Sequence, residues 1–131
     1  MKSIIRLAVI VLAMAPAFGF AQTDKKAVWP EMKNFHSFMS STFHPAEEGN
    51  LAPLKAKAAD LLKAAKEWQA SKVPSNFKAE ETTAQLEKLV KYCNGISEAV
   101  ASGSDDATLK TMITEAHEVF HKIVGECKKA E

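Results

Sequence analysis

Four histidines are the residues of this sequence most suited to chemistry, because neutral imidazole is the commonest metal ligand in proteins. His36 and His44 lie in one segment, and His117 and His121 lie near the other end of the chain. The second pair is four residues apart, so on a helix both rings lie on one face, one turn apart. That spacing suits two ligands on one metal ion. The histidines therefore predict a metal site if the fold brings the two segments together.

Methionine sulfur extends the set of candidate ligands around His36, with Met32 before it and Met39 after it at helical spacing. A thioether favours Cu(I), whereas three imidazoles with an open position suit Zn(II) or Cu(II). We predict a centre built from His36, His117 and His121, with Met32, Met39 or a water molecule completing the ligand shell.

A second, peripheral site is predicted at His44, because Glu47 or Glu48 could add a carboxylate ligand beside its imidazole. The same corner of the fold would contain Asp105 and Asp106. A metal-free alternative stays open, in which the histidines pack or face solvent and the protein is a helical interaction module.

The segment His117-Glu118-Val119-Phe120-His121 also has the His-Glu-x-x-His form of zinc peptidases. A peptidase needs a substrate cleft, and so short a chain offers no second domain to form one. Nucleophile elbows and glycine-rich phosphate loops are absent from the sequence. We therefore expect no enzymatic activity and assign these two histidines to metal binding.

Apolar residues at spacings of three and four predict four helices, over about residues 30–43, 51–71, 79–101 and 105–125. Pro30 suits a first helical turn, and Pro45 predicts that the first helix stops at His44. The segments show no strand-like alternation, and the links between them are short. The prediction is one all-α domain over residues 22–131, folded as an antiparallel up-down-up-down four-helix bundle.

Such a bundle predicts which candidate ligands meet. On a helical wheel His36 lies about 35° from the middle of the first apolar stripe, so its side chain is expected to point inward. Counted from the shared end of the bundle at about 1.5 Å per residue, His36 lies about 12 Å in and His117 about 18 Å in, a difference of one turn. His36 and His117 could therefore share a level, with Met32 and His121 forming a second level one turn further on.

Residues 1–21 are predicted to be a cleavable secretory signal peptide. They combine a basic start, an apolar run over 7–20 and small residues, Gly19 and Ala21, at the −3 and −1 positions. The run is shorter than the ~20 residues that span a membrane, and no later segment approaches that length. We expect a mature protein outside the cytoplasmic membrane, in a bacterial periplasm, with no membrane association after cleavage.

Charge argues against a nucleic-acid partner. The chain has 17 Lys and Arg, 16 Asp and Glu, and a formal net charge of +1. Its sole arginine, Arg6, and one lysine, Lys2, fall in the predicted signal, so the mature chain is close to neutral and lacks arginine. Recognition of phosphates and bases relies on the guanidinium group, so nucleic acid is excluded.

The order of these features resembles the cytochrome b562 and cytochrome c′ group of periplasmic four-helix bundles. Met32 in Glu31-Met32-Lys33 and His121 in Phe120-His121 stand where that group holds its haem ligands. The resemblance implies haem b between Met32 and His121, with single-electron transfer to a redox partner. A Cys-x-x-Cys-His motif for covalent attachment is absent from the sequence.

Two metal functions therefore remain open from the sequence. One is the haem b electron-transfer protein that the resemblance implies. The other is a copper or zinc protein, because the additional imidazoles of His36 and His117 suit a mononuclear ion better than haem. Such a protein would buffer metal or deliver it to a partner, and its imidazoles would release the ion as they protonate below pH ~6.5.

The two cysteines do not form a pair in the expected register. An oxidising compartment favours a disulfide, but Cys93 and Cys127 would lie about 20 Å apart along a regular hairpin, against the ~4.4–6.8 Å between Cα atoms of a bridge. We expect a buried Cys93 and a terminal Cys127 that is free, cross-linked to another chain or a minor metal ligand.

Overall fold

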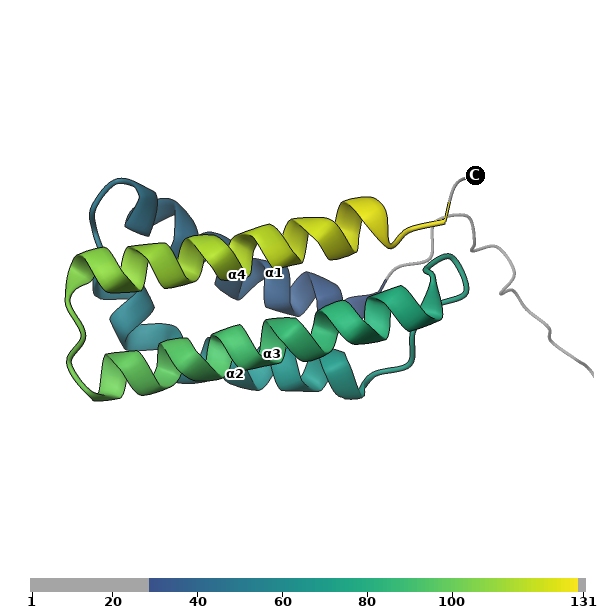
Figure 1. The fold of residues 1–131 in the computed structure, drawn as a ribbon, viewed down its shortest axis with the longest axis horizontal. Helices are drawn as coiled ribbons and strands as arrows, with labels where there is room; N and C mark the ends of the chain where they lie inside the picture. Colours follow the sequence, from purple (N-terminus) through teal and green to yellow (C-terminus); the bar gives the residue numbers. More distant parts are fainter. Residues whose placement is uncertain (1–28, 130–131) are drawn as a thin grey trace, which may run out of the picture.

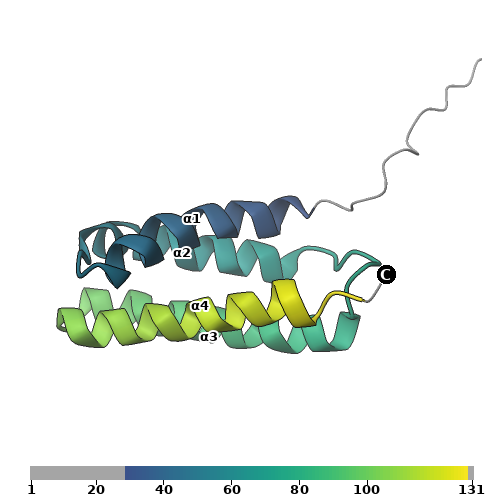
Figure 2. The same ribbon diagram turned by 90° about the horizontal axis from the view of Figure 1, so that it is seen from above.

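The computed structural model describes residues 29–129, which fold into four helices (Figure 1). They are α1 (Pro30–Glu47), α2 (Ala52–Ala70), α3 (Ala79–Ala101) and α4 (Asp106–Glu126). Consecutive helices pack together, and α1 closes the bundle against α4. Figures 1 and 2 show the helices running antiparallel along one long axis. The predicted all-α four-helix bundle is confirmed.

Each helix buries the apolar stripe that its spacing predicted. On α2 the stripe residues Leu54, Leu61 and Trp68 have no exposed surface, and on α4 the same is true of Ile113 and Ile123. Burial of these side chains is the main stabilising contribution to the fold, at about 1.5–3 kcal/mol for each large aliphatic side chain. The core extends along the whole bundle.

The predicted end of the first helix at His44 was wrong. Helix α1 continues through Pro45 to Glu47. Proline lacks the N–H that would bond one turn back, but so close to a helix end only one such bond is lost. The backbone N–H of Asn50 then donates to the Pro45 carbonyl at 2.9 Å, and Gly49 adopts a φ of +92° that favours glycine, which closes the helix.

The start of α4 has an acidic cap. The Asp105 carboxylate accepts a hydrogen bond from the backbone N–H of Thr108 at 2.8 Å. This bond satisfies one of the free N–H groups at the helix start and lowers the pKa of Asp105. Asp106 forms an ion pair with Lys55 of α2 at 2.9 Å, which ties the start of α4 to the second helix.

The opposite end of the bundle is closed by the chain that follows α4. The backbone N–H of Lys78 donates to the Cys127 carbonyl at 2.7 Å, and the N–H of Lys129 donates to the Asn76 carbonyl at 2.9 Å. Beside this seam the Trp29 indole N–H donates to Ser71 Oγ at 2.8 Å. Both ends are therefore fastened independently of the histidines.

The predicted signal peptide, residues 1–21, lies outside the described residues. Within residues 29–129, none of the helices has the length and apolar content needed to cross a membrane.

Candidate metal centre

A small pocket lies between α1 and α4, and all four histidines contribute to it. Its volume is about 180 Å³. The lining residues are His36, Met39, Ser40, Phe43 and His44 from α1 and His117, Phe120 and His121 from α4. The two segments that carry the candidate ligands therefore meet, although they are far apart in the sequence.

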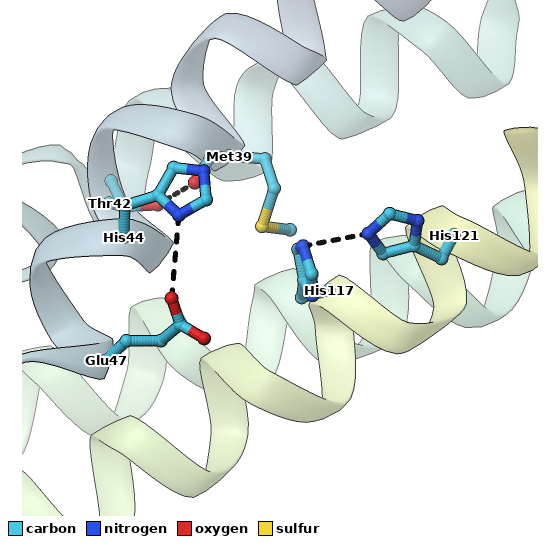
Figure 3. A network of polar contacts seen from close by, with 6 residues as sticks. All are labelled: Met39, Thr42, His44, Glu47, His117 and His121. Atoms are coloured by element: carbon cyan, nitrogen blue, oxygen red, sulfur yellow. Dashed lines mark hydrogen bonds and ion pairs between the residues drawn. The ribbon is translucent and has the colours of Figure 1, made fainter.

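His117 and His121 form the closest pair of candidate ligands. They lie one turn apart on α4, and their Nε2 atoms are 3.1 Å apart, within hydrogen-bond distance of each other (Figure 3). Two nitrogen ligands, each ~2.0–2.1 Å from a tetrahedral ion, are separated by about 3.3 Å. The spacing of the two nitrogens is thus close to what one ion would require.

Phe43 fixes the ring of His117. The two rings are stacked with centroids 3.7 Å apart and an angle of 9° between their planes. Desolvation lowers the pKa of half-buried His117, and the neighbouring His121 lowers it further. The lowered pKa favours the neutral imidazole, whose lone pair is free to bind a metal ion.

The prediction that His36 points inward was wrong, because its side chain is exposed. The preceding residue, Phe35, takes the core position and has no exposed surface. His36 is one residue further round the helix, at the margin that faces α4, where it stacks on Phe120 with centroids 5.3 Å apart and an angle of 11°. Its ring still lines the pocket.

The predicted levels also differ from those of the structure. His36 stacks on Phe120 rather than lying level with His117, and His117 instead lies against Phe43. The two helices are displaced by about one turn from the counted register. The count assumed that the first helix stops at His44, level with the start of the fourth, whereas α1 continues to Glu47.

His44 is exposed at the edge of the pocket and carries its own acidic neighbour. Its Nδ1 lies 3.6 Å from a Glu47 carboxylate oxygen, and its ring is tilted against Phe43 with centroids 5.6 Å apart. This pair matches the predicted peripheral carboxylate–imidazole arrangement. The Asp106 carboxylate is not part of it, since that group pairs with Lys55 on α2.

The two candidate methionines have different positions. Met39 lines the pocket and is 1% exposed. Met32 is half-buried and packs against the apolar core, and it is not among the residues that line the pocket. Met39 is therefore the thioether that the fold places beside the imidazoles.

The residues do not fit haem b held between Met32 and His121. His121 is exposed rather than directed into the bundle. The space between the helices is filled by Phe35, Trp68 and Phe120, whose rings lie 5.4–5.9 Å apart. The pocket itself is below the ~300–1,000 Å³ typical of sites for small organic ligands and cofactors. The site has the dimensions of a mononuclear centre.

Glu118 follows His117 directly, as the base does in the His-Glu-x-x-His motif. Its side chain is exposed and is not among the residues that line the pocket, although His117 and His121 on either side of it are. The pocket therefore presents the two imidazoles without this carboxylate in its lining.

The two cysteines lie apart from the pocket. Cys93 and Cys127 are both buried as free thiols. Burial raises the pKa of Cys93 to about 12, which keeps it as a neutral thiol. Cys127, expected to be merely terminal, is 3% exposed because the chain after α4 folds against the link between α2 and α3.

The sequence reasoning did not identify Phe43 and Phe120 as the surfaces on which the imidazoles stack. The feature of the sequence that could have indicated this stacking is the position of Phe43 and Phe120 at the edge of an apolar stripe, one residue before His44 and His121 respectively. The stacking depends on the register of α1 against α4, which the sequence did not define.

In the arrangement described for residues 29–129, three or more His, Cys, Asp or Glu side chains do not converge on one point. The two α4 nitrogens are the closest pair among the imidazoles, and the exposed side chains of His36 and His44 can change direction by rotation. Comparisons with protein-family models, curated proteins and solved structures found no match. The fold and the pocket together define the class of protein, which is a four-helix bundle with a histidine-lined pocket between its first and last helices.

Proposed function

We propose that this protein binds a single transition-metal ion in the pocket between α1 and α4. His117 and His121 are the primary ligands through their Nε2 atoms, and His36 or His44 from α1 completes the shell by rotating inward. The observation that most directly supports this proposal is the 3.1 Å separation of the two Nε2 atoms, in a pocket lined by four imidazoles.

The position of the pocket supports metal exchange rather than a permanent structural role. The bundle is closed at both ends by its own hydrogen bonds, and its core is filled by apolar side chains. Folding therefore does not depend on metal, unlike folding of small zinc domains. Exposed His36 and His44 lie at the mouth, where a partner or a chelator can reach the ion.

This placement suits a periplasmic protein that buffers copper or zinc, or delivers it to a partner. The predicted signal peptide supports the compartment. The filled core and the size of the pocket disfavour haem b and electron transfer. Catalysis is not proposed, because Glu118 is not among the residues that line the pocket.

The test is calorimetric titration of metal-free protein, lacking residues 1–21, with Zn(II) and with Cu(II). We expect one ion per chain. Replacing both His117 and His121 by Ala should abolish binding, and single replacement of His36 or His44 should show which one completes the shell. Glu98→Gln on α3 is the control, because Glu98 is exposed and bonds only to Asn94.

Absence of binding by the unmodified protein, or equal binding by the double variant, would contradict the proposal. The first result would leave the metal-free interaction module. The second would place any bound metal elsewhere in the chain.

A further inference from the structure

Met39 places a sulfur atom at the α4 histidine pair without exposing it to bulk solvent. Its side chain is 1% exposed, yet it lines the pocket together with His117 and His121. Figure 3 shows the Met39 thioether reaching from α1 toward the His117 ring. Met39 supplies the only sulfur among the residues that line the pocket.

The charge around the pocket disfavours a divalent ion. The lining residues include no Asp or Glu. Glu47 is engaged with His44 at the edge, and Glu118 is exposed outside the lining. Transfer of a 2+ charge into a site with neutral ligands and aromatic walls is more costly than transfer of a 1+ charge. Two imidazoles and a thioether are all neutral, so any compensation of the ion's charge comes only from Glu47 and Glu118 outside the lining.

The donor set also suits a soft ion. Thioether sulfur selects Cu(I), whereas Zn(II) takes imidazole, thiolate or carboxylate in a four-coordinate shell. Two Nε2 atoms on α4 and one Sδ atom from α1 offer three donors on two rigid helices. Phe43 and Phe120 add apolar surface to the lining of the pocket.

We infer that the site selects Cu(I) over Zn(II), with Met39 Sδ as the third ligand beside His117 and His121 Nε2. This inference rests on the proposed function, since it assigns the metal and the third donor of the same centre. Met39 then completes the shell for Cu(I), whereas His36 or His44 completes it for Zn(II) or Cu(II).

The test compares Met39→Leu with Met32→Leu. Leucine replaces methionine in cores with little structural change, so both variants keep the apolar volume. Met32 lies on the same helix but outside the pocket lining. Cu(I) affinity is measured without oxygen by competition with a coloured Cu(I) chelator, and Zn(II) affinity by competition with a zinc-sensitive dye. Circular dichroism and thermal unfolding verify that each variant folds.

We expect the unmodified protein to bind Cu(I) more tightly than Zn(II). Met39→Leu should weaken Cu(I) binding by about tenfold or more, since even partners that only support a ligand contribute 10–100-fold to affinity. Zn(II) binding should change by less than about twofold, and Met32→Leu should leave both affinities unchanged. X-ray absorption at the copper edge should show a sulfur neighbour that disappears in Met39→Leu.

Tighter binding of Zn(II) than Cu(I), or unchanged Cu(I) affinity in folded Met39→Leu, would overturn this inference while leaving a histidine metal site in place. A sulfur neighbour that persists in Met39→Leu would do the same. Failure of the proposed function is distinguishable, because neither ion would then bind in a manner that depends on His117 and His121.

Discussion

Replacing Phe43 by Leu should separate the positioning of His117 from the stability of the bundle. Phe43 is 6% exposed and its ring stacks on His117 with centroids 3.7 Å apart. Leucine keeps a buried apolar side chain but removes the flat surface that fixes the imidazole. The ring of His117 should then sample several orientations in the metal-free protein.

Two magnitudes follow from this geometry. Loss of aromatic contact contributes about 0.5–1.5 kcal/mol, and the smaller side chain leaves part of its volume unfilled, so the free energy of unfolding should fall by about 1–2 kcal/mol. Metal affinity should fall by about tenfold, at the lower end of what residues that orient a ligand contribute. A tenfold loss corresponds to about 1.4 kcal/mol.

The assay combines urea unfolding of the metal-free protein with calorimetric metal titration. Phe77→Leu is the matched control: Phe77 is 3% exposed and packs on Trp29 at the opposite end of the bundle. That variant should lose similar stability but retain the metal affinity of the unmodified protein. Equal metal affinities in Phe43→Leu and the unmodified protein would refute the idea that Phe43 orients His117.

Three further predictions concern the scaffold. Gly95→Ala should stabilise the protein by about 0.5–1 kcal/mol in urea unfolding, because the new Cβ meets only the flexible end of Met112 at 3.4 Å. Gly103→Ala should destabilise it by about 1–2 kcal/mol, because φ at that position is +79°. A Gly103→Ala variant more stable than Gly95→Ala would contradict this. Cys93, with its pKa raised to about 12, should react with iodoacetamide at pH 8 only as the protein unfolds. Mass spectrometry of labelled peptides measures this reaction, and rapid labelling of the folded protein would contradict the burial of Cys93. The pKa of Asp105 is lowered in the folded state, so its ionised form stabilises the fold above the ordinary pKa of 3.8, and this contribution is lost as pH falls further. Asp105→Asn keeps a helix cap without a titrating group, so below pH 3.8 its midpoint of urea unfolding should change less with pH than that of the unmodified protein. Identical dependence of the two midpoints on pH would exclude a role for this carboxylate.

Much of the fold could be predicted from the sequence because apolar side chains at helical spacing have one simple outcome, burial against neighbouring helices. The stripe Leu54, Leu61 and Trp68 is fully buried, as its spacing predicted. The end of α1 was harder to predict. A proline disfavours helical structure in the residue before it, but α1 continues through Pro45 and ends in the turn at Gly49 and Asn50.

The site could be predicted only in part. The spacing of His117 and His121 placed both on one helical face, and their nitrogens do lie close together. The direction of His36 could not be read from its own helix, because Phe35 competes for the same inward position and the larger apolar ring is buried. The stacking of imidazoles on Phe43 and Phe120 depends on how far α1 slides along α4, which one-helix patterns do not determine.

The most direct test of the metal centre is NMR of the histidine ring nitrogens during titration with Zn(II) or, without oxygen, Cu(I), both of which are diamagnetic. Long-range proton–nitrogen spectra distinguish Nε2 from Nδ1 in each ring. We predict that the Nε2 resonances of His117 and His121 shift together and saturate at one ion per chain. Unchanged Nε2 resonances at saturating metal, or a shift confined to one of the two rings, would contradict a centre held by this pair.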